Sequence, residues 1–163
     1  MKTKIFLLGV AGFMMLSVAS CLAQREVAAY NTFQTECLGI EMDGSQTLQV
    51  WGTGRNRIDA VAQAKKNAVR DVLFNGIVAG KPDCQKKPVL PEVNVLEKNE
   101  DYFNKFFADG GDFRDFISVR DERIGHRITR DKMKAQNQVT NSVIVRVDRP
   151  GLIKKMKDDG ILK

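Results

Sequence analysis

Few residues of this chain have types and spacing that could support catalysis or metal binding. His126 is the only histidine, and neither a nucleophile nor a second metal ligand lies at a useful spacing from it. Asp109, Asp112 and Asp115 flank two glycines, but they lack the regular spacing of a calcium loop and its final bidentate Glu. We therefore predict no catalytic residue, no metal and no cofactor, and a structural role for His126.

A pair of glycines raises the question of a nucleotide site. Gly52-Thr53-Gly54-Arg55-Asn56-Arg57 begins like a dinucleotide fingerprint, yet Arg57 stands where the third glycine belongs. No clear parallel β-α-β unit follows it either. The simpler interpretation is a tight turn between a strand and a helix, in which Gly52 and Gly54 accept backbone angles that a Cβ would forbid.

The first 23 residues are arranged like an export signal. Two lysines precede an uncharged apolar run, Ile5 to Val18, which is short for a membrane span. Val18-Ala19-Ser20-Cys21 resembles a lipobox, and cleavage there would leave Cys21 as a lipidated N-terminus. Cleavage after Ala23 fits equally well. Both alternatives predict one exported domain, 24–163, in the periplasm or at the outer membrane.

Two further cysteines, Cys37 and Cys84, remain unacylated under either cleavage. An exported chain meets no glutathione pool that would keep their thiols reduced. Cys37 begins the first predicted strand, and Cys84 lies in a proline-rich loop, 78–94, after the central helix. A returning helix can bring that loop beside the start of the strand. We therefore predict a Cys37–Cys84 disulfide, with two buried free thiols as the alternative.

The centre of the predicted fold is a strand, a turn and a long helix between residues 46 and 75. Leu48 and Val50 alternate with polar residues in the strand. Just before the strand, Asp43-Gly44 predicts a hairpin with an earlier strand at 38–42. The helix carries small residues at every fourth position, which let it lie close to a sheet: Ala60, Ala64 and Ala68.

The rest of the chain mixes helical and extended patterns. The prolines of 78–94 predict an ordered surface loop. Helical spacing returns at 97–108, residues 112–130 and 136–147 alternate like a charged hairpin, and Pro150 begins a short helix. We therefore predict an α+β fold: an antiparallel sheet of about four strands, two main helices and a short C-terminal helix.

Charge and aromatic residues indicate where a partner could bind. The formal net charge is +6, which favours anionic partners only weakly. No aromatics alternate with the basic residues, which argues against nucleic acid. An aromatic stripe in the 97–108 helix is typical of a core, but it could instead form a groove. The candidate partner surface combines that stripe with the basic hairpin: Tyr102, Phe106, Arg123 and Arg127.

The central unit resembles a bacterial envelope family that includes small surface lipoproteins and the N-terminal domain of the flagellar assembly protein T. The resemblance covers about a third of the chain and rests on a strand ending in Gly-x-Gly and a helix with regularly spaced alanines. It implies an α+β domain with a non-enzymatic role, and it supplies no catalytic residues. The matching positions are Val50, Gly52, Gly54, Ala60, Ala64, Ala68, Val69 and Val72.

These observations together predict a non-enzymatic binding or structural module of the envelope. Its expected partner is another envelope protein, peptidoglycan or an anionic glycan, and it would contact a membrane only through a lipid anchor. An exported hydrolase with an unrecognised site and a subunit of a larger envelope assembly are the alternatives.

Overall fold

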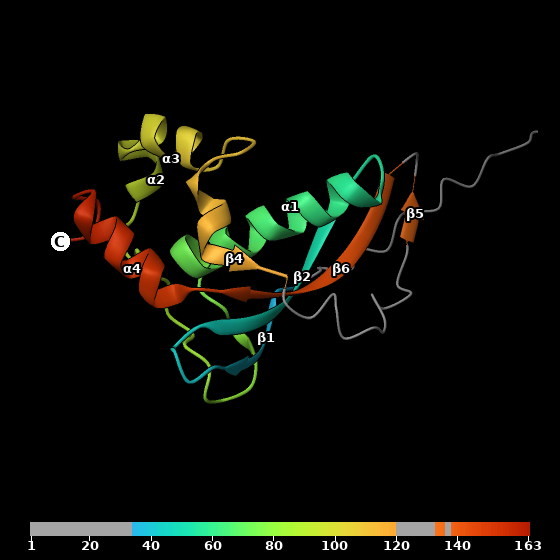
Figure 1. Cartoon of the computed structure of the whole chain (residues 1–163), viewed down its shortest axis with the longest axis horizontal. Helices are drawn as coiled ribbons and strands as arrows, with labels where there is room; N and C mark the ends of the chain where they lie inside the picture. The colour runs from blue at the N-terminus through green and yellow to red at the C-terminus, as the bar shows by residue number, and fades with distance from the viewer. Residues whose placement is uncertain (1–33, 120–132, 136–137) are drawn as a thin grey trace, which may run out of the picture. The chain divides into compact units, whose positions relative to one another are not determined.

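The computed structural model describes residues 34–119, 133–135 and 138–163, and Figure 1 shows their arrangement. All of them belong to one compact unit of the chain. Within this described part, no helix has the length and hydropathy of a membrane span.

Two long antiparallel strands, β2 (Gln46–Gly54) and β6 (Gln138–Val147), form the centre of the sheet. Their pairing runs without interruption from Gln46 opposite Val147 to Gly54 opposite Val139. Because side chains alternate between the two faces of a strand, apolar residues two positions apart point together into the core. The buried apolar residues of the pair are Leu48, Val50, Val143, Val145 and Val147.

The other strands extend this pair into a mixed sheet. Strand β1 (Glu36–Ile40) pairs antiparallel with β2, as the Asp43-Gly44 turn predicts, and β3 (Ala79–Gly80) pairs parallel with β1. Strands β4 (Ile117–Ser118) and β5 (Met133–Ala135) both pair antiparallel with β6. The order is β3-β1-β2-β6-β4, with β5 also on β6.

The fold class is therefore α+β, and the predicted antiparallel sheet of about four strands agrees with the observed mixed sheet only in part. The sheet has six strands among the described residues, and the β1–β3 pair is parallel. Strands β3 and β4 contain two residues each, which is too short for an alternating pattern to be visible. The predicted strand 112–130 begins instead as a 3-10 helix, Asp112–Phe116, and most of its remainder lies outside the described residues.

Helix α1 (Arg57–Arg70) packs against β2 and β6 through its alanine stripe. Asn56 caps the helix, because its side-chain oxygen accepts a hydrogen bond from the Asp59 amide. A turn of π-helix, Asp71–Asn75, continues α1 and ends at Gly76, where φ is +74°. The three alanines of the stripe, Ala60, Ala64 and Ala68, are fully buried.

The glycine pair has a different role from the predicted turn. Gly52 and Gly54 lie inside β2, and neither has a positive φ. A Cβ on Gly52 would collide with the backbone of Ala60 and Ala64, and one on Gly54 would collide with the Ala60 amide. The glycines are therefore required because the backbone of α1 lies directly against the strand.

Ala64→Leu is expected to lower the free energy of unfolding by about 1–3 kcal/mol, because there is no space for the added atoms between α1 and β2. Ala62→Leu on the same helix is the matched control. Ala62 is exposed, so its substitution should change stability by less than about 0.5 kcal/mol. Urea denaturation measures both, and equal effects would show that the alanine stripe is not packed.

Short helices follow α1 and complete the core. The predicted 97–108 helix is divided at Asn99 into α2 (Val95–Lys98) and α3 (Glu100–Phe106). The Asn99 side chain donates to the Val95 carbonyl, which ends α2, while its own carbonyl accepts from the Phe103 amide and begins α3. Helix α4 (Arg149–Asp158) is the predicted short C-terminal helix, and it is capped by Asp148.

An aromatic cluster joins α3 to the end of α1. The Phe74 ring lies 4.9 Å from that of Phe103, edge to face, and 6.3 Å from that of Phe107. Phe113 adds to this cluster from the 3-10 helix, with its ring 5.9 Å from Phe107. The aromatic side of α3 is therefore part of the core.

Candidate anion-binding groove

A groove of 560 Å³ lies between the N-terminal half of α1 and the segment from Asp109 to Ile117. We call it the α1 groove. Two rows at i, i+4 spacing along the helix form one wall, so their side chains share one face. The described residues that line it are Arg57, Ile58, Val61, Ala62, Lys65, Lys66, Asp109, Phe113, Arg114 and Ile117.

Cations dominate the polar part of this lining. Four basic residues face a single carboxylate, that of Asp109, which pairs with Lys66 at 2.8 Å. In the described part of the chain, no carboxylate lies within 4.0 Å of the charged nitrogens of Arg57, Lys65 or Arg114. The groove therefore holds three cations that lack an ion-pair partner among the described residues, which is a favourable environment for an anion.

Lys66 is the most constrained of the four cations. Its Nζ lies 5.8 Å from the centre of the Phe113 ring, and its side chain is 24% exposed. Its hydrogen bond lowers the pKa of the Asp109 carboxyl, whose side chain is 94% exposed. Lys66 therefore already has an anionic partner, and a ligand would meet the other three cations first.

Apolar side chains form the floor between the cations. Ile58 is 80% exposed, and Val61 and Ile117 are half-buried. Phe113 is buried beneath them. A large exposed isoleucine beside a cavity is a feature of ligand sites, because pockets are mostly apolar with a few charged groups that orient the ligand.

The two described residues of the predicted partner surface, Tyr102 and Phe106, do not line this groove. Phe106 is 3% exposed and packs with its ring 5.0 Å from Phe107, so it belongs to the core and not to a surface. Tyr102 is half-buried, and its hydroxyl donates to the Asp159 carboxylate. Burial, together with that carboxylate, raises the pKa of Tyr102. Arg123 and Arg127 lie outside the described residues, as does His126.

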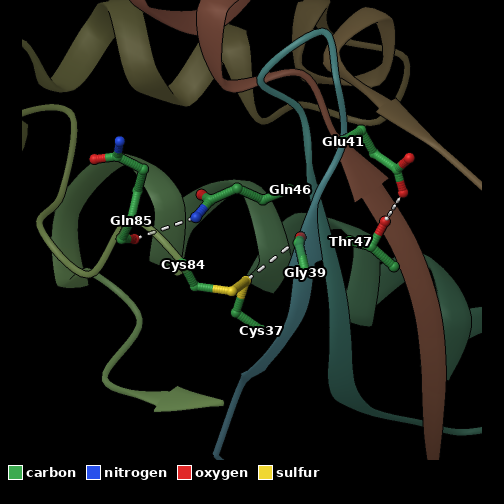
Figure 2. The surroundings of a disulfide bond; sticks show 7 residues. All are labelled: Cys37, Gly39, Glu41, Gln46, Thr47, Cys84 and Gln85. Atoms are coloured by element: carbon green, nitrogen blue, oxygen red, sulfur yellow. Dashed lines mark hydrogen bonds between the residues drawn. A yellow bond between two sulfur atoms is a disulfide. The ribbon is translucent and has the colours of Figure 1, made fainter. Parts of the chain in front are cut away.

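The predicted cysteine pair lies at disulfide distance, as Figure 2 shows. The Cα atoms of Cys37 and Cys84 are 6.3 Å apart, within the usual range for a disulfide. Both side chains are buried. The pair attaches the proline-rich loop to β1, which is the strand predicted to begin at Cys37. Cys21, the lipidation candidate, lies outside the described residues.

The acidic residues that flank the double glycine are separated in the structure. Asp109 pairs with Lys66, and Asp112 pairs with Lys155 at 3.6 Å. Among the described residues, no three His, Cys, Asp or Glu side chains converge as a metal site would require. Comparisons with protein-family models, with curated proteins and with solved structures find no match to this chain.

Proposed function

We propose that this chain is a non-enzymatic binding module of the bacterial envelope, and that its α1 groove holds an anionic glycan. The observation that carries this proposal is the set of three cations, Arg57, Lys65 and Arg114, which have no ion-pair partner in the described part of the chain. Arginine forms bidentate hydrogen bonds with carboxylate and phosphate groups, and lysine adds a mobile point charge.

The spacing of the cations favours a polymer over a single small anion. Arg57 and Lys65 are two helical turns apart, about 12 Å along the axis. One carboxylate or phosphate would contact both only if the two side chains bent toward each other, whereas successive charged groups of a chain can contact each cation separately. The apolar floor would then contact the uncharged faces of the sugar rings. Both walls belong to ordered elements, so little backbone conformational entropy is lost on binding.

The envelope location is proposed on independent grounds. The N-terminal segment, with its two cleavage alternatives, indicates export. The pairing of Cys37 with Cys84 supports the same view, because disulfides persist mainly in oxidising compartments. Acylation of Cys21 would place the module at a membrane, and cleavage after Ala23 would release it into the periplasm.

Replacement of two groove cations should weaken binding to an anionic glycan. We expect Lys65→Gln with Arg114→Gln to raise the Kd for alginate, a carboxylate-bearing glycan, about tenfold in isothermal titration calorimetry, because two surface ion pairs are lost. Binding by the unmodified chain should also weaken between 50 and 200 mM salt, as expected for screened charges.

The matched control removes the same charge elsewhere. Lys105 and Lys157 are exposed on α3 and α4, and neither lines the groove. Lys105→Gln with Lys157→Gln should leave the Kd for alginate unchanged. An equal loss in this variant, or equal binding of neutral dextran, would overturn the assignment of the groove.

A further inference from the structure

The loop from Lys81 to Pro88, here called the Cys84 loop, is attached to the body of the protein through its backbone. Three successive carbonyl oxygens, those of Gln85, Lys86 and Lys87, each accept a hydrogen bond from outside the loop. The donors, in the same order, are Gln46 Nε2, the Ile77 amide and Arg149 Nη2, at 3.2, 3.0 and 2.8 Å.

Further links fix the start of the loop. The Lys81 amide donates to the Cys37 carbonyl at 3.0 Å, and Cys84 bonds to Cys37 through sulfur. Figure 2 shows this bond beside the hydrogen bond between Gln46 and Gln85. The backbone of the Cys84 loop is therefore ordered by covalent and polar contacts, although Cys84 alone among residues 81–87 is buried.

The side chains of this ordered loop carry a positive charge into solvent. Lys81, Lys86 and Lys87 are exposed, with only Asp83 to oppose them. Beneath them lies a fourth cation, the guanidinium of Arg149. This residue is 9% exposed, and burial lowers its pKa, although an arginine stays charged at neutral pH.

No carboxylate of the described residues neutralises the Arg149 charge. Its described polar contact is the Lys87 carbonyl, and none of the described acids lies within ion-pair distance of it. A buried charge without a counter-ion is energetically costly. The positive field of Arg149 also adds to that of the lysines above it. The loop and its support therefore form a local excess of positive charge that an external anion would compensate.

We propose that the Cys84 loop binds the anionic phosphate headgroups of a lipid bilayer. Lysines suit mobile, dispersed phosphates because they act as point charges, whereas the α1 groove offers arginine forks. Val78, which is 70% exposed and immediately precedes β3, adds an apolar group near the same loop. This site is separate from the α1 groove, since no residue of the loop lines that groove.

The N-terminal lipidation candidate lies within reach of such a bilayer. About 16 residues separate Cys21 from Cys37, a span of at most roughly 55 Å when extended. Cys37 is bonded to the loop. One acyl chain alone gives marginal, reversible membrane binding, and a basic patch is a common second signal. The loop lysines would supply that second signal.

The test uses a chain that begins at Cys21, with Cys37 and Cys84 left in their disulfide. The free Cys21 thiol is alkylated with N-tetradecylmaleimide, which supplies one lipid chain. Partition is measured by sedimentation with phosphatidylcholine vesicles that contain either no phosphatidylglycerol or 30%. Because each lysine contributes about fivefold near an anionic surface, the anionic lipid should raise partition about 100-fold.

The triple variant Lys81→Gln, Lys86→Gln, Lys87→Gln should lose at least tenfold of this gain. The groove variant Lys65→Gln, Lys66→Gln, Arg114→Gln removes the same charge and should keep the gain. Equal losses in both variants, or full partition of the loop variant, would overturn the proposal. Alginate binding by the loop variant should be normal, so failure of this proposal is distinguishable from failure of the groove.

Discussion

Gly52→Ala is expected to lower the free energy of unfolding by more than about 3 kcal/mol, beyond the usual cost of overpacking. The added methyl group would meet the Ala60 carbonyl oxygen and the Ala64 amide nitrogen, which are backbone atoms. A side chain can change its rotamer, but a helix backbone must move as a whole. The move would also open the contact of the alanine stripe with β2 and β6.

Gly39→Ala is the matched control for this substitution. Gly39 lies on the neighbouring strand β1, has no positive φ, and a Cβ there would meet only the Lys81 ammonium at 4.0 Å. Chemical denaturation of both variants, with an unchanged m-value, measures the difference. A Gly52→Ala protein as stable as Gly39→Ala would show that α1 does not lie against the strand.

Loss of the Cys37–Cys84 bond is expected to destabilise the domain by about 4 kcal/mol, because 47 residues separate the two cysteines and the unfolded chain regains their freedom. The closed loop contains β2 and α1, so the bond restricts the centre of the fold. We expect Cys37→Ser with Cys84→Ser to show this loss in denaturation without reductant.

Reduction of the unmodified chain provides an independent check if the double variant does not fold. Its stability in dithiothreitol should fall by the same amount, and the reductant should have no effect on the double variant. Non-reducing mass spectrometry of the unfolded chain decides whether the bond forms. Two alkylatable thiols at Cys37 and Cys84 would contradict it.

The sequence predicts the centre of the fold well because its signals there are local. Alternation identifies β2 and β6, and Asp43-Gly44 identifies the β1–β2 hairpin. Alanine spacing and the Asn56 cap identify α1 and its buried face. Each of these signals is contained within about ten residues, so no knowledge of distant neighbours is needed.

Features that depend on distant neighbours were not predictable in the same way. The glycines of β2 look like turn residues until α1 is placed against them. Phe106 fits a groove or a core equally well until the aromatic cluster is known. The α1 groove brings together residues far apart in sequence, and only the repeat of Arg57, Val61 and Lys65 beside Ile58 could have indicated one wall.

The position of β6 has a consequence for the timing of folding. Gln46 pairs with Val147, roughly 100 residues later, and β6 lies between β2 and β4 within the sheet. The long pairing edge of β2 cannot be filled until almost the whole chain is available, and such distant contacts form slowly. Under the export that we propose, this delay would keep the central sheet open until the C-terminal segment has crossed the membrane.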